Sequence, residues 1–127
     1  MIPLAIAGAA GRMGKALVRA AVARGMPVVG GTERPGHPDL GKDIAQAAGL
    51  DPIGVSITAD PGAAAAEASV WIDFTTPAAV RAALNALPGG VRAVVIGATG
   101  FSPDDEAAIA AHAQARAIVK SGNFSLG

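Results

Sequence analysis

Short apolar runs alternate with helical patterns along the whole chain. The runs fall at residues 4–8, 27–33, 55–58, 70–75, 92–98 and 117–121, and the helical patterns at residues 12–25, 77–87 and 103–116. Several of the runs are apolar throughout, which is typical of parallel strands that are covered on both faces. The sequence therefore predicts an α/β fold, a doubly wound parallel sheet with helices on both faces.

Length and composition narrow the class of protein further. With 127 residues the chain is expected to form a single domain, residues 1–127, around one core. Ten basic residues balance ten acidic ones and are scattered, which argues against binding of nucleic acid or of an anionic membrane. The absence of cysteine excludes disulfides and thiolate chemistry. No apolar run approaches the ~18 residues of a membrane span and no basic leader is seen, so we expect a cytoplasmic protein.

Three glycines follow the first apolar run at a spacing of three, within the stretch "IAGAAGRMGK". A dinucleotide site needs a tight turn after the strand, close approach of backbone to the pyrophosphate, and a helix that begins at once. Gly8, Gly11 and Gly14 lie where these needs arise, so the pattern favours a Rossmann-like dinucleotide-binding domain. The alternative is close packing of strand and helix without a ligand.

Glu33 ends the second apolar run, about 20 residues beyond the last glycine. A carboxylate there accepts the hydroxyls of an adenosine ribose, whereas the neighbouring Arg34 can pair with a ribose 2′-phosphate. The sequence thus permits NADH or NADPH as cofactor. A solvated loop charge is the alternative for Arg34.

Small or polar clusters follow several of the predicted strands. Because parallel strands bring their carboxyl ends to one edge of the sheet, these clusters are expected to meet there. Residues Gly97 to Gly100 are expected to let backbone approach a nicotinamide, and Ser121 to Phe124 to offer amide bonds and an aromatic face. Their alternatives are a turn that leads into a helix and a terminal loop.

Other candidate side chains favour structural roles. His37 is expected in a solvated loop, His112 on a helix away from the strand ends, and Lys120 as a strand-end charge. Asp73 is expected to orient a loop or to pair locally, and Trp71 to pack against a helix. Thr76 and Ser102, each followed by proline, are expected to cap helices. No catalytic set and no metal site is predicted.

Five motifs in order, "IAGAAGRMGK", "TERPG", "WIDFTTPAAV", "VIGATGFS" and "SGNFSLG", resemble the N-terminal domain of the dihydrodipicolinate reductase family from Ile6 to the last residue. The resemblance implies hydride transfer from NADPH or NADH to a cyclic dicarboxylate on the pathway to diaminopimelate and lysine. It implies that the pyrophosphate is held by Gly8, Ala9, Ala10, Gly11, Arg12 and Met13. Glu33 would bind the ribose, and Arg34 a 2′-phosphate.

The resemblance also assigns the nicotinamide end of the site. It implies that this end is lined by Gly97, Ala98, Thr99, Ser121, Gly122, Asn123 and Phe124, with Thr99 near the substrate. The family commonly has threonine where this chain has Ala98, so a hydroxyl is missing there while backbone contacts are retained.

In the resembled family a second domain follows the "NFS" motif, supplies the proton, holds the substrate carboxylates and builds a homotetramer. This chain stops at Gly127, so it is expected to be the cofactor-binding part only, with no catalytic residue and no turnover alone. Two other functions stay open: a non-catalytic dinucleotide-sensing module, and another small amino-acid dehydrogenase.

Overall fold

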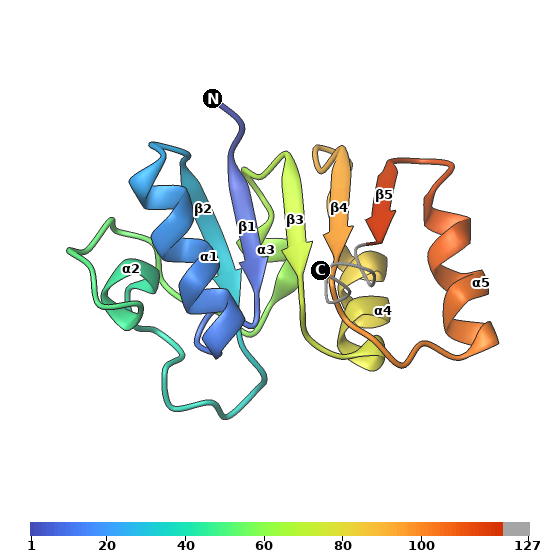
Figure 1. The fold of residues 1–127 in the computed structure, drawn as a ribbon, viewed down its shortest axis with the longest axis horizontal. Helices are drawn as coiled ribbons and strands as arrows, with labels where there is room; N and C mark the ends of the chain where they lie inside the picture. Colours follow the sequence, from blue (N-terminus) through green and yellow to red (C-terminus); the bar gives the residue numbers. More distant parts are fainter. Residues whose placement is uncertain (121–127) are drawn as a thin grey trace, which may run out of the picture.

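Five parallel strands form one sheet in the order β2-β1-β3-β4-β5 (Figure 1). The computed structural model describes residues 1–120. The strands are β1 Leu4–Ala7, β2 Val28–Thr32, β3 Val70–Asp73, β4 Ala93–Ile96 and β5 Ala117–Lys120. The helices are α1 Arg12–Ala23, α2 Ile44–Ala47, α3 Pro61–Ala64, α4 Pro77–Ala86 and α5 Pro103–His112. The predicted Rossmann-like parallel sheet is confirmed, and the strand order reverses between β1 and β3.

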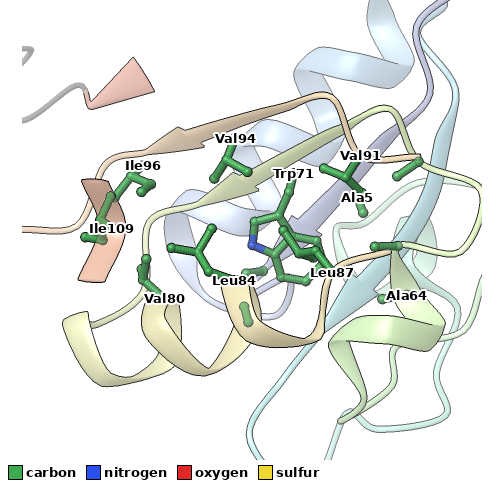
Figure 2. Packing of buried hydrophobic residues seen from close by; sticks show 14 of the residues in the cluster. Ala5, Ala64, Trp71, Val80, Leu84, Leu87, Val91, Val94, Ile96 and Ile109 are labelled. Carbon is green, nitrogen blue, oxygen red and sulfur yellow. The ribbon is translucent and has the colours of Figure 1, made fainter. Parts of the chain in front are cut away.

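Alternate residues of the strands feed two hydrophobic cores, one on each face of the sheet, which corrects the expectation of one core. Ala5, Trp71 and Val94 face a core that α3, α4 and α5 complete, whereas Leu4 and Ile6 face a second core beneath α1 and α2. Figure 2 shows the Trp71 indole between the sheet and the α4 side. The expectation that Trp71 packs against a helix is confirmed, and helices lie on both faces of the sheet.

The second face is covered only in part within residues 1–120. Ile72, Val95 and Val119 align across β3, β4 and β5. Ile72 and Val95 are half-buried, while Val119 is 51% exposed. Coverage by helices on this face therefore ends near β3 within residues 1–120.

The strand that the sequence predicts at residues 55–58 does not form. In its place Ser56 and Thr58 form isolated bridges, one antiparallel to Asp43 and one parallel to Thr32. Ile57 is buried in the second core, and its N–H donates to the carbonyl of Lys42 at 2.9 Å. The apolar residues are explained by this burial, and the two partners lie in different segments, so no regular ladder forms.

The helix starts agree with the predicted caps. The Thr76 hydroxyl accepts the N–H of Ala79, and Ser102 forms a reciprocal capping box with Asp105. The last helix ends at His112, four residues before the predicted end at residue 116. The short helices α2 and α3 were not predicted, because four residues are too few to show a helical period.

In helix α1, Met13, Leu17 and Ala20/Ala21 recur at helical spacing, which predicts that this face packs on the sheet; Leu17 and Ala21 do pack against the second core. Gly14, Val18 and Ala21 are buried, whereas Met13 is 49% exposed. The expectation that Met13 packs on the sheet is wrong, because the buried stripe lies one residue further along the helix. Met13 is instead free to face the edge where the strands end.

Asp43 closes the loop between β2 and β3. Its carboxylate accepts five backbone N–H groups, from Ala45 and Gln46 and from residues 53–55. Burial raises the pKa of Asp43, but the backbone donors lower it more, so the pKa lies below its ordinary value. A carboxyl with a depressed pKa in the folded state stabilises the fold above its unfolded pKa, and that stability is lost as the pH falls through the folded pKa.

We predict that Asp43→Ala lowers the free energy of unfolding by about 2 kcal/mol at pH 7, measured by urea denaturation. The deficit relative to the unchanged chain should shrink as the pH falls below about 4. Asp60→Ala is the matched control, because Asp60 caps α3 through one N–H and should cost about 1 kcal/mol or less. Equal losses for the two variants would contradict the assignment.

None of the helices within residues 1–120 is long and apolar enough to cross a membrane.

Candidate functional site

The turn after β1 has three glycines with three different surroundings. Gly8 has φ +69°, a conformation that favours glycine. A β-carbon on Gly14 would lie 2.1 Å from the Gly8 carbonyl oxygen, so Gly14 allows α1 to pack on the turn. Gly11 has ordinary extended angles, and a β-carbon there would meet only the Gly8 carbonyl oxygen, at 3.4 Å. Of the three glycines, Gly11 is therefore the one whose lack of a side chain is not required by packing within residues 1–120.

Helix α1 begins without a capping side chain. Gly11 at its N-cap offers no oxygen, and the first turn holds no acidic residue. The other four helices of residues 1–120 each have a side-chain cap, from Asp43, Asp60, Thr76 and Ser102. The N–H groups at the start of α1 are thus directed at the strand-end edge, and no side chain of residues 1–120 accepts them, which suits an anion.

Glu33 ties the end of β2 to this turn. Its Oε2 accepts the N–H of Ala10 at 3.0 Å, and its Oε1 accepts the N–H of Arg34 at 3.3 Å. Ala9 is fully buried beneath the turn, and its N–H donates to the Thr32 carbonyl. The Glu33 carboxylate is therefore oriented by backbone before any ligand is present.

Two adjacent cavities lie at this edge. The smaller, about 220 Å³, is lined by residues of the turn and α1, including Gly11, Arg12 and Met13. The larger, about 490 Å³, extends from Glu33 and Arg34 to the first turns of α4, with Trp71 in its wall. Ala7, Gly8, Glu33 and Thr75 line both cavities, so the two form one site between the turn, the end of β2 and α4.

The residues expected at a nicotinamide lie apart from these cavities. Gly97 is covered by the Phe74 ring, Ala98 is buried in the first core, and Thr99 is exposed. None of the three lines either cavity. Ser121, Gly122, Asn123 and Phe124 lie outside the described residues.

Sequence reasoning gave Thr75 no role and gave Asp73 only a structural one, although both lie at the centre of the site. Thr75 lines both cavities, and Asp73 accepts three hydrogen bonds at the end of β3. Their signal was their place after the central strand, beside the point where the strand order reverses. Thr32, Pro35 and Ala79 also line the larger cavity; they lie within the motifs "TERPG" and "WIDFTTPAAV", but sequence reasoning gave them no role in the site.

The remaining candidates lie outside both cavities. His37 Nδ1 accepts the N–H of Asp39 at 2.9 Å, and His112 Nε2 lies 3.2 Å from the Asn85 side-chain oxygen. Lys120 pairs with Glu106, and its Nζ lies 5.0 Å from the centre of the Phe101 ring. Lys120 is exposed at the end of β5, as expected for a strand-end charge, and its ammonium group has two partners there.

A parallel sheet with a glycine turn, an uncapped first helix and cavities at the reversal of strand order defines a Rossmann-like α/β domain. The model of the family described as dihydrodipicolinate reductase, N-terminus, matches residues 2–124. This chain belongs to that family.

Relatives and a solved structure agree with this membership. The chain is 47% identical to the 4-hydroxy-tetrahydrodipicolinate reductase of Chelativorans sp. (strain BNC1), over 98% of the chain and 45% of the relative. It is 48% identical to that of Dinoroseobacter shibae, over 98% of the chain and 46% of the relative. The chain thus spans about half the length of the curated relatives it matches.

The solved structure is a dipicolinate-bound dihydrodipicolinate reductase from Paenisporosarcina sp. TG-14. It matches with a TM-score of 0.69 at 22% identity, over 99% of this chain and 49% of that one. At this identity the likeness establishes the fold.

Proposed function

We propose that this chain is the NAD(P)H-binding part of a 4-hydroxy-tetrahydrodipicolinate reductase. The observation that carries the proposal is the uncapped N-terminus of α1, which faces a cavity at the reversal of strand order. A pyrophosphate bound there supplies the acceptors that the first turn of α1 lacks. Gly11 leaves room for it, and Arg12 and Met13 line the same cavity.

The adenosine half of the cofactor fits the larger cavity. Glu33 is already oriented by Ala10 and accepts ribose hydroxyls, and Arg34 lies beside it in the same cavity wall. A volume of about 490 Å³ and a wall of alanine, proline and tryptophan suit a flat apolar base.

The nicotinamide belongs beyond Phe74, toward residues 97–100. In this proposal Gly97, Ala98 and Thr99 and the segment Ser121 to Phe124 line the nicotinamide, with Thr99 nearest a cyclic dicarboxylate substrate. The cofactor supplies a hydride, and the chain's own residues bind and orient it. We further propose a single domain over residues 1–127, a cytoplasmic location, and a homotetramer of the whole enzyme.

Titration of the 127-residue chain with NADH and with NADPH tests the proposal. Trp71 is the only tryptophan and lines the larger cavity, so its emission should fall while nicotinamide emission rises, with one shared dissociation constant. NMN, which has no adenosine, is the control and should bind far more weakly. Absence of saturable binding at millimolar cofactor would refute the proposal.

We predict that Arg34→Ala weakens the binding of NADPH by about 1 to 3 kcal/mol and leaves the binding of NADH nearly unchanged. The Arg34 side chain is exposed at the cavity wall, and no partner for its guanidinium is recorded within residues 1–120. It is therefore available to a 2′-phosphate, which only NADPH carries. Calorimetry with both cofactors measures the difference.

Arg92→Ala is the matched control for Arg34→Ala. Arg92 is also exposed but lies just before β4, at the opposite end of the strands. This control should leave both affinities unchanged. Equal weakening of NADH and NADPH by Arg34→Ala would show that Arg34 does not contact the 2′-phosphate.

A further inference from the structure

Asp73 is a buried carboxylate for which the proposed cofactor contacts give no role. It is 1% exposed at the end of β3, and no cationic side chain pairs with it within residues 1–120. Its Oδ2 accepts the Trp71 indole N–H at 3.1 Å, and its Oδ1 accepts the backbone N–H of Thr75 at 3.0 Å. The Thr75 hydroxyl also donates to Oδ1. These three bonds offset the cost of burying the carboxylate.

The bonds to Asp73 orient Thr75 against the glycine turn. A β-carbon on Gly8 would lie 2.8 Å from the Thr75 Cγ2 methyl, so the two residues are in close contact. Gly8 is the first residue of the turn that holds the pyrophosphate in the proposed function. The orientation of Thr75 is therefore passed to the turn by contact.

The same segment contacts the loop on the other side. The Asp73 carbonyl accepts the N–H of Gly97 at 2.8 Å, and a β-carbon on Gly97 would lie 2.0 Å from the Phe74 ring. Strand β3 lies between β1 and β4, so residues 73–75 reach both the turn after β1 and the loop after β4.

We propose that Asp73 is a positioning residue for the dinucleotide site. Through Thr75 and Phe74 its carboxylate fixes the glycine turn and the 97–100 loop relative to each other, and so aligns the two ends of one cofactor. The expected effect of Asp73 on cofactor affinity rests on the proposed function. Its effect on the relative positions of the two loops does not.

Asp73→Asn tests the proposal, with Asp43→Asn as the matched control. An asparagine has one accepting oxygen, so either Trp71 or Thr75 loses its acceptor. Asp73→Asn should weaken the binding of NADH at least about tenfold and speed amide hydrogen exchange at residues 8–13 and 97–100. Asp43 also accepts backbone N–H groups, but it lies outside both cavities, so Asp43→Asn should lower stability without changing NADH affinity or exchange at those residues.

Thr75→Val gives a second route if Asp73→Asn does not fold. It removes the hydroxyl, keeps a branched side chain over Gly8, and should weaken NADH about three- to tenfold. If Asp73 acts through Thr75, the double variant binds about as weakly as Asp73→Asn alone, because the two changes break the same link.

Two outcomes would overturn the proposal. One is that Asp73→Asn and Thr75→Val lower stability but keep the affinity and the exchange rates of the unchanged chain at residues 8–13 and 97–100. The other is that their effects on affinity simply add. If the unchanged chain binds no nicotinamide dinucleotide, the proposed function fails, and the exchange comparison still decides whether Asp73 positions the two loops.

Discussion

Gly11→Val is expected to abolish dinucleotide binding while the fold is retained. Gly11 has φ −79° and ψ 173°, which any residue adopts, and a β-carbon there meets no side chain. The valine methyl groups would instead occupy the space beside the first turn of α1, where the pyrophosphate is proposed to bind. We expect a loss of about 3 kcal/mol or more in affinity, at least about a hundredfold, since charge-assisted bonds to the phosphates are lost.

The stability of Gly11→Val should change by about 1 kcal/mol or less, because only the N-cap preference for glycine over valine is lost. Gly14→Val is the contrasting variant. Its β-carbon would lie 2.1 Å from the Gly8 carbonyl oxygen, and we expect about 3 kcal/mol or more of destabilisation. Calorimetry with NADH and thermal unfolding of both variants separate the two effects. Wild-type affinity in Gly11→Val would refute the pyrophosphate assignment.

The second large effect is an expected absence of turnover by the 127-residue chain alone. Hydride transfer needs the substrate held about 3 to 3.5 Å from the nicotinamide carbon, and this positioning supplies much of the rate. Two carboxylates must be bound, yet the cationic side chains at this edge within residues 1–120 are either assigned to the cofactor or already paired. Arg12 and Arg34 line the proposed cofactor cavities, and Lys120 pairs with Glu106.

We therefore expect a substrate-dependent rate more than about 10³-fold below that of the full-length relative from Chelativorans, measured as loss of NADPH absorbance with freshly generated substrate. The same relative shortened to the region that matches this chain is the control, and it should lose activity to the same extent. A rate for this chain comparable to the full-length relative would contradict the prediction and make Lys120 the first candidate proton donor.

The glycine turn could be predicted from sequence because its requirements are local. The positive φ at Gly8 and the close helix contact at Gly14 each favour glycine at a fixed distance along the chain, and Gly11 between them leaves the N-cap of α1 without a side chain. The caps at Thr76 and Ser102 were predictable for the same reason. The parallel sheet followed from apolar strands that alternate with helical patterns.

What sequence reasoning missed depends on contacts between distant segments. The segment 55–58 has the composition of a strand, but its partners, Asp43 and Thr32, lie in two different segments. Met13 fits a helical period, yet the buried stripe of α1 is decided by the approach of Gly14 to the turn. The contact of Thr75 with Gly8 joins residues far apart in the chain, and no local sequence pattern predicts it.

Because α1 has no side-chain cap within residues 1–120, ligand binding at its N-terminus is coupled to the stability of this helix. Four helices have their own capping side chains, whereas α1 begins at a glycine with none. A phosphate bound there would accept N–H groups at the start of α1, as the Ser102 hydroxyl does at the start of α5. A ligand that binds only the folded state stabilises that state by RT ln(1 + [L]/Kd). A cell's supply of cofactor would then set how long this domain survives proteolysis as well as how often its site is filled.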